Sequence, residues 1–304
     1  MESLKIIRYR SVQYGTVHFA KWKAAKDNVQ VILATLGHKL RLVQKSPILW
    51  TRDINSYHET SQAIWDSLHK KVFVKATSEN WLKIAKEFEN RWNFPHCIGK
   101  RIYIIPIELW MESISEFKHH HFLVQNINNY KQFFSIILMA MCDANYKFTF
   151  VDIGGMGSES DGGVFSRSKF AKLLQSNQLH LPSPTYIGGF LNCLFPYFIV
   201  ADEVFPLKEN IMRPYPGKFL NKSRIIENTF DILVSRWRIF QGPIKATVEN
   251  IDKYVQATVC LHNYLKIWEE CNPKNTHKYC PPNYIDSDLN GNLQLGECNR
   301  AKYL

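Results

Sequence analysis

Several features that would assign a sequence to a class at once are missing from this chain. Its 304 residues contain no internal repeat and no low-complexity tract. A glycine-rich phosphate loop of the type G-x-x-x-x-G-K is also missing, which argues against an ATPase. The start, MESLKIIRYR, carries charges where a signal peptide needs an apolar core. Residues 181–201 have no charge, but their prolines and glycines make a poor membrane helix, so we expect no membrane segment.

The seven cysteines are an odd number and widely spaced. Four of them lie inside apolar runs: Cys97, Cys142, Cys193 and Cys260. This is typical of reduced, buried thiols in an intracellular protein rather than of a disulfide framework. One set of residues offers four zinc ligands, Cys271, His277, Cys280 and Cys298, but its spacing fits no common zinc pattern. The adjacent histidines 119–121 rarely point the same way, so we expect no zinc there either.

Acidic residues are few for the number of basic ones. The formal net charge is +11, and the sequence pI is about 9.2. Residues 1–50 hold nine Lys and Arg against Glu2 and Asp27, so that end alone carries +7 of the charge. Such a balance favours a polyanionic partner, and the alternative is a merely solvated basic face.

Apolar periodicity indicates helices and strands in alternation. A helix follows Ser61, and a second helix over residues 79–92 has one apolar stripe: Trp81, Ile84, Ala85 and Phe88. Residues 132–142 and the following YKFTFVDI predict an antiparallel hairpin whose first strand is buried on both faces. The GGMG run after it is predicted to be a turn.

Further along, Asp161 is expected to cap a helix that runs to about residue 175. The other predicted elements are a buried strand at 195–200, helices at 226–240 and 247–268, and a poorly ordered polar tail after Trp268. Together these elements predict an α/β fold, with a mixed sheet and helices on its faces. Residues 1–60 give weak signals.

Two carboxylates stand where metal chemistry would need them. Asp202 follows the buried strand, and side chains at strand ends reach the ligand crevice of α/β sheets. Glu227, on the next helix, can face the same edge, and two carboxylates suit Mg²⁺ or Mn²⁺. The alternative is a loop aspartate and a surface glutamate with no joint role.

Five longer segments carry a family resemblance. They are EFENRWNFPHCIG (87–99), FFSIILMAMCDANYKFTFVDIGGMGSESDGGVF (133–165), PYFIVADEVFPLKENIMRPYPG (196–217), IIENTFDILVSRWRIF (225–240) and ATVCLHNYL (257–265). With them, the chain from about Gln62 to Trp268 resembles the catalytic domain of Harbinger (PIF) superfamily DDE transposases. The resemblance implies a ribonuclease H-like fold with an Asp-Asp-Glu triad.

The resemblance also implies roles for particular residues. Asp202, in Val200-Ala201-Asp202-Glu203, takes the place of the second aspartate, and Glu227, in I-E-N-T-F, takes the place of the glutamate. Both would then be catalytic and metal-binding residues, with Mg²⁺ or Mn²⁺ as cofactor. DNA would be the substrate, and a Myb-like protein would be a partner. The protein would be located in the nucleus, with the cytoplasm as a further location.

The chain departs from the family pattern in several places. The first aspartate belongs in a strand reading A-I-D-G-x-H after FPHCIG, yet no Asp lies between Cys97 and Cys142. Residues 100–128 do not match, and the connection at 217–224 is short. Two further acids, Asp152 and Asp161, fall in matched segments and are secondary candidates.

Three hypotheses follow. The chain is an impaired metal-dependent nuclease, a catalytically inactive DNA-binding or scaffold protein, or a fragment that lacks a central strand and does not fold. The first two require residues 102–107 to pair beside the strand at 132–142. The predicted domains are a basic region at 1–60, a helical segment at 61–93, the ribonuclease H-like domain at 94–268, and the polar tail at 269–304.

Overall fold

The computed structural model describes residues 50–108, 135–187, 193–202, 205, 207–213, 225–244, 246, 248–282 and 284. The chain divides into two compact units, Met1–Asn55 and Ser56–Leu304, and nearly all described residues belong to the second. The histidines 119–121, Cys298 and nearly all of the basic region 1–60 lie outside the described residues. The predicted domain boundaries stay predictions.

The helices are α3 (Trp50–Val72), α4 (Ser78–Trp92), α6 (Asp161–Arg167), α7 (Lys169–Gln175), α8 (Ile225–Arg236) and α9 (Val248–Glu270), with short 3₁₀ helices η3 (Arg238–Phe240) and η4 (Lys274–Thr276). The strands are β1 (Cys97–Glu108), β2 (Ser135–Cys142), β3 (Phe148–Met156), β4 (Thr185–Tyr186), β5 (Leu194–Phe195), β6 (Phe198–Val200) and β7 (Ile211–Met212). No helix among the described ranges is long and apolar enough to cross a membrane.

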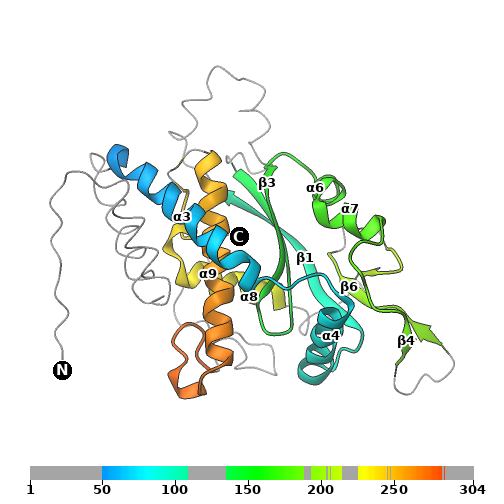
Figure 1. Cartoon of the computed structure of the whole chain (residues 1–304). Coiled ribbons are helices and arrows are strands. Elements are labelled where there is room, and N and C mark those ends of the chain that lie inside the picture. The colour runs from blue at the N-terminus through cyan, green and yellow to red at the C-terminus, as the bar shows by residue number, and fades with distance from the viewer. Residues whose placement is uncertain are drawn as a thin grey trace. The chain divides into compact units, whose positions relative to one another are not determined.

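Five strands form one mixed sheet in the order β3-β2-β1-β6-β7, while β4 and β5 pair in a separate small hairpin (Figure 1). The first three strands of this order are antiparallel, and β6 and β7 run parallel to β1. The predicted α/β sheet with flanking helices is therefore confirmed. The predicted strand at 195–200 is interrupted, because Phe195 ends β5 and β6 begins at Phe198.

Strand β1 occupies the centre of the sheet. It pairs with β2 from Tyr103 opposite Ala140 to Glu108 opposite Ser135. The prediction that residues 102–107 take the place of the missing strand is confirmed. The segment can form a strand because it is rich in isoleucine, whose branched side chain favours extended backbone.

Helices cover both faces of the sheet. A bulge in β3 directs one phenylalanine to the helices on each face. Phe148 pairs with Cys142 and Phe150 with Met141, so one extra residue, Thr149, lies between them. The two phenylalanines therefore face opposite ways. Phe148 contacts Phe230 of α8, with ring centroids 5.3 Å apart, whereas Phe150 contacts Phe170 of α7 at 5.0 Å.

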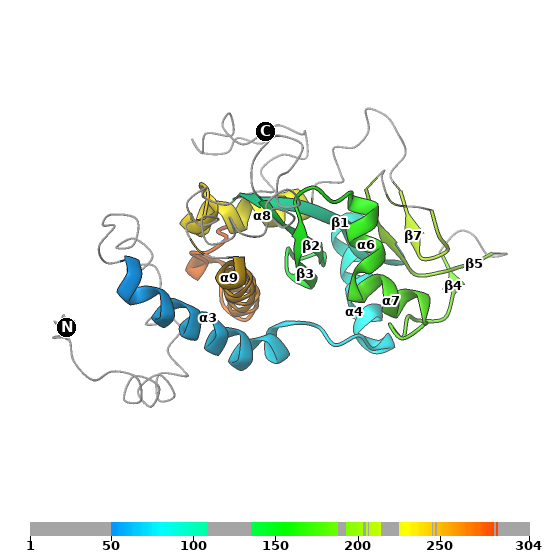
Figure 2. The same cartoon turned by 90° about the horizontal axis from the view of Figure 1, so that it is seen from above.

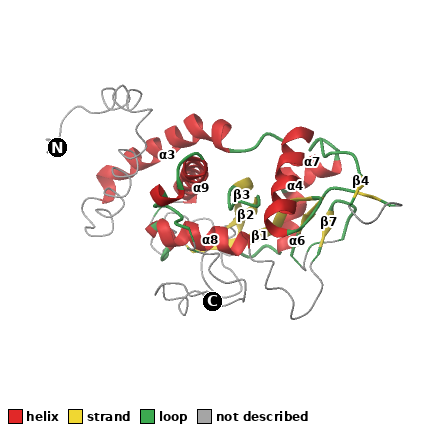
Figure 3. Ribbon diagram, turned by 90° about the horizontal axis from the view of Figure 1, so that it is seen from below, coloured by secondary structure: helices red, strands yellow, loops and turns green. Residues whose placement is uncertain are grey.

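The views from above and below agree with this division. Helices α8 and α9 lie on one side of β1–β3, and α4, α6 and α7 lie on the other (Figures 2 and 3). Strand β2, between these layers, is buried along its whole length, as predicted. The stripe of α4 is also confirmed, since Trp81, Ile84, Ala85 and Phe88 are all buried.

Three local predictions are wrong. Gly154, Gly155 and Met156 of the predicted turn continue β3. The cap of α6 is Ser160, whose hydroxyl accepts from the Gly163 N–H, and Asp161 is the first helical residue. The predicted helix to residue 175 breaks at Ser168, whose hydroxyl accepts from the Ala171 N–H and so starts α7.

The carboxyl-terminal part also differs from its prediction. Helix α8 ends at Arg236 and is followed by η3, so the predicted helix over 226–240 is shorter. The expected poorly ordered tail begins with a packed segment, because Tyr279 is only 9% exposed. The sequence of this segment is polar and does not predict the packing, because one buried aromatic residue leaves no periodic pattern.

Candidate metal and active site

Asp202 lies just beyond the buried end of β6. All three residues of β6 are buried, and Ala201 is held to the neighbouring strand because its N–H donates to the Met212 carbonyl oxygen at 2.8 Å. Asp202 itself is partly exposed, and its carbonyl oxygen accepts from the Phe205 N–H at 3.1 Å. The carboxylate therefore stands at a strand end on a fixed turn, as predicted from the sequence.

Asp161 is the carboxylate that the structure brings to Asp202. Burial and the negative charge of Asp202 raise the pKa of the Asp161 carboxyl above its ordinary value. The two elements are packed together, because Phe165 of α6 meets Phe205 edge to face at 5.1 Å between ring centroids. In the sequence Asp161 is only a secondary candidate, because an aspartate at a helix start is more simply explained as a cap.

Glu227, the second predicted site residue, lies in the first turn of α8. Its Oε2 atom is buried, and its charge acts on the Cys142 thiol at the end of β2. Burial raises the pKa of Cys142 well above its usual range, the contact with Thr229 lowers it, and the charges of Asp143 and Glu227 raise it further. The Thr229 hydroxyl lies 3.3 Å from the Cys142 sulfur.

Backbone pairing across β2, β1 and β6 connects the surroundings of Glu227 with those of Asp202. Lys100 of β1 pairs with Cys142 on one side and with Val200 on the other. Neighbouring strands lie about 4.8 Å apart, so Cys142 and Val200 are separated by about 10 Å of sheet. Glu227 beside Cys142 and Asp202 beyond Val200 thus belong to the same end of the sheet, on either side of β1.

The position of the missing aspartate falls on this intervening strand. Setting the pattern A-I-D-G after FPHCIG puts its aspartate at Ile102. Residue 102 follows Lys100 by two positions, as Asp202 follows Val200, and β1 and β6 are parallel. Position 102 falls where the pairing of β1 with β2 shifts register, between Lys100 and Tyr103, and it carries an isoleucine.

The other candidates have structural partners. The Oδ2 atom of Asp152 accepts from the Lys169 N–H at 3.4 Å, at the start of α7. His262 is fully buried. The ring of His277 lies 2.9 Å from the Asn272 carbonyl oxygen. Among the described residues, no group of three or more His, Cys, Asp or Glu side chains could hold a metal ion.

Residues 124–263 match the family of DDE superfamily endonucleases. The match supports a relationship to this superfamily, and it spans Asp161, Asp202 and Glu227 but slightly less than half of the chain. A search of curated proteins and a search of solved structures gave no match.

DDE endonucleases generally use divalent metals, and the residues present fit such an ion in part. Asp161 and Asp202 offer the carboxylate oxygens that hard cations take as ligands. Burial raises the pKa of Asp161 most, and the charge of Asp202 raises it further; a bound cation would relieve this repulsion between the two carboxylates. The donor set is nevertheless smaller than a triad among the described residues.

Proposed function

We propose that this domain is a transposase-type, metal-dependent DNA nuclease of the Harbinger kind, with a ribonuclease H-like fold and impaired cleavage. The observation that carries the proposal is the position of Asp202. It follows the parallel strand β6, beside the central strand β1, and Asp161 shares its electrostatic field. The match to DDE endonucleases over 124–263 supports the same chemistry.

In this proposal Asp202 and Glu227 are the catalytic and metal-binding residues, and Asp161 joins Asp202 as an additional ligand. A bound Mg²⁺ or Mn²⁺ would stabilise the charges of the attacking and leaving oxygens of a phosphodiester. The turn after β6 fixes Asp202, and the buried face of α8 fixes Glu227. Because residue 102 supplies no carboxylate, we expect weak metal binding and slow cleavage.

A second candidate is a catalytically inactive DNA-binding or scaffold protein. Two observations favour it: the isoleucine at position 102, and the lack of any three-donor metal group in the described part of the chain. A net charge of +11 would support binding to DNA phosphates, with affinity that falls as salt rises. Under either candidate we propose a nuclear location, and a Myb-like partner by resemblance.

Nicking of supercoiled DNA by the purified chain tests the proposal, with Mn²⁺, Mg²⁺ or EDTA in parallel. Metal-dependent nicking that Asp202→Asn and Glu227→Gln each abolish supports the nuclease. Glu79→Gln is the matched control, since it removes one surface charge paired with Lys83 at 2.7 Å on α4. If the folded wild-type chain binds DNA but never nicks it, the inactive alternative holds.

A further inference from the structure

A buried relay of side chains ties the segment after α9 to the core. The Trp237 indole N–H donates to the Tyr279 hydroxyl oxygen at 3.0 Å, and that hydroxyl lies 2.8 Å from Nδ1 of His262. Nε2 of His262 lies 2.6 Å from the Tyr146 carbonyl oxygen. A carbonyl can only accept, so Nε2 carries the proton, and Nδ1 accepts from Tyr279. Every donor in the relay thus has one acceptor.

The backbone of the same segment is fixed by a buried carboxylate. Glu269, 2% exposed, lies in the last turn of α9. Its Oε1 accepts from the N–H groups of Tyr279 at 2.7 Å and Cys280 at 2.9 Å. One buried oxygen thus accepts two backbone hydrogen bonds, which hold this turn against the end of α9.

Tyr284 extends the contact to the last turn of α8. Its hydroxyl donates to the Ser235 hydroxyl oxygen at 2.9 Å, and the guanidinium of Arg236 lies over its ring at 4.8 Å. Tyr279 and Tyr284, which we call the clasp, therefore hold Ser235, Arg236 and Trp237 together. These three residues are the end of α8 and its continuation.

The first half of α8 rests on β2 and β3. Thr229 lies against Cys142, and Phe230 against Phe148. Glu227 is next to these contacts. An α-helix of 12 residues is a rod of about 18 Å, so loosening one end changes the tilt of the whole helix. The clasp therefore influences the position of Glu227. Both clasp residues lie beyond the segment that matches the family, which ends at residue 263.

We propose that Tyr279 and Tyr284 are positioning residues for α8, and through it for Glu227. The role assigned to Glu227 rests on the proposed nuclease function, whereas the docking of α8 does not. Cys142 offers a readout of docking alone. It is fully buried beneath Thr229, so its thiol reacts only when α8 lifts from β2.

The experiment is alkylation of the native, full-length chain by N-ethylmaleimide, with mass spectrometry resolving the rate at each cysteine. Three variants are compared: Tyr279→Phe, which removes the relay hydroxyl; Tyr284→Ala, which removes both contacts with α8; and Tyr284→Phe, which keeps the ring over Arg236. Tyr186→Phe, at a tyrosine that is 59% exposed, is the matched control. Buried Cys97 and Cys260 report on global unfolding.

We expect Tyr279→Phe and Tyr284→Ala to raise the Cys142 rate by about tenfold or more, because each loses buried or partly buried hydrogen bonds. Cys97 and Cys260 should keep their wild-type rates, and Tyr284→Phe should recover part of the protection. An equal rise at all three buried cysteines, or no rise at Cys142, overturns the proposal. If the wild-type chain nicks DNA, Tyr279→Phe should also lower kcat more than it changes KM. If the wild-type chain does not nick DNA, only the proposed nuclease function fails, and the alkylation rates still decide whether the clasp positions α8.

Discussion

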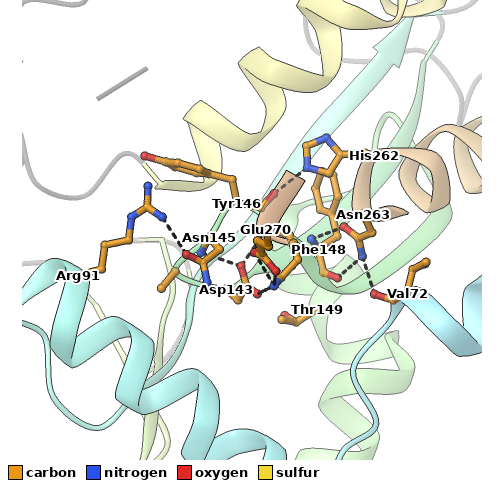
Figure 4. Close-up of polar contacts among 12 residues, drawn as sticks. Val72, Arg91, Asp143, Asn145, Tyr146, Phe148, Thr149, His262, Asn263 and Glu270 are labelled. Carbon is orange, nitrogen blue, oxygen red and sulfur yellow. Dashed lines mark hydrogen bonds and ion pairs between the residues drawn. The ribbon is translucent and has the colours of Figure 1, made fainter. Parts of the chain in front are cut away.

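Asn263 of α9 pairs with both backbone groups of Phe148, as a neighbouring strand would. Its Oδ1 accepts from the Phe148 N–H at 2.8 Å, and its Nδ2 donates to the Phe148 carbonyl oxygen at 2.7 Å (Figure 4). The same Nδ2 donates to the Val72 carbonyl oxygen at 3.3 Å. One buried amide therefore joins the last helix of the domain, the first residue of β3 and the end of α3.

Replacing this amide by a carboxylate should be severely destabilising. In Asn263→Asp the group at the Nδ2 position can no longer donate, and it faces two carbonyl oxygens in a fully buried place. We expect a loss of about 3 kcal/mol or more in the free energy of unfolding, measured with urea at pH 7. Asn272→Asp is the control, because its amide donates to the Trp268 carbonyl oxygen in an exposed position. Equal losses for the two variants would contradict this account.

His262 should make the protein sensitive to acid. Burial lowers its pKa to about 3, the hydrogen bond to Tyr146 raises it, and the charge of Lys266 lowers it. The unfolded chain binds a proton near pH 6.5, whereas the folded chain does not. The contribution of His262 is thus fully present above pH 6.5 and is lost progressively as pH falls toward 3.

Two measurements check this expectation. Urea unfolding between pH 4.5 and 7 should show stability that rises with pH, by at most about 1.4 kcal/mol per unit for one proton. The NMR shift of the His262 ring should stay constant through this range. A His262 ring that titrates near pH 6.5 would show that the buried relay is not formed.

Much of this fold follows from patterns that lie close together in the sequence. The stripe of α4, the hairpin of β2 and β3 and the isoleucine-rich strand β1 each leave a periodic or continuous apolar signal. The break at Ser168 leaves none, because a serine within a helical pattern either caps a helix or faces solvent. The burial of Tyr279 depends on three partners that are distant in the sequence, so a polar segment looked disordered.

The candidate site, like the fold, was predictable from the sequence where it depends on local pattern. Asp202 at a strand end follows from local pattern, and so does Glu227 in the first turn of a helix. The approach of Asp161 to Asp202 does not, since it depends on how α6 packs through Phe165 and Phe205. Only tertiary structure brings together two carboxylates that are 41 residues apart.

This approach leads to a prediction for Asp161→Asn. Because burial and the Asp202 charge both disfavour an ionised Asp161, the neutral amide should raise the melting temperature at pH 7 in EDTA. The same change removes a proposed Mn²⁺ ligand, so the increase in melting temperature caused by Mn²⁺ should shrink. Thermal unfolding with and without Mn²⁺ measures both effects, and Asp152→Asn is the acidic control. A variant that is less stable in EDTA but responds normally to Mn²⁺ would show that Asp161 is a structural residue only.

Restoring a carboxylate at position 102 should restore function if the backbone of the site is intact. Residue 102 lies on β1, between β2, whose Cys142 is near Glu227, and β6, which leads to Asp202. Residues 103–108 of β1 pair with β2. Ile102→Asp should therefore strengthen Mn²⁺ binding and raise metal-dependent nicking by about tenfold or more, as expected when one more carboxylate is added to a metal site. Ile102→Asn is the matched control, with the same shape but no charge, and it should gain neither property. If both variants fold and neither binds Mn²⁺ more tightly than wild type, the end of this sheet no longer holds a metal site, and the inactive DNA-binding alternative becomes the better account.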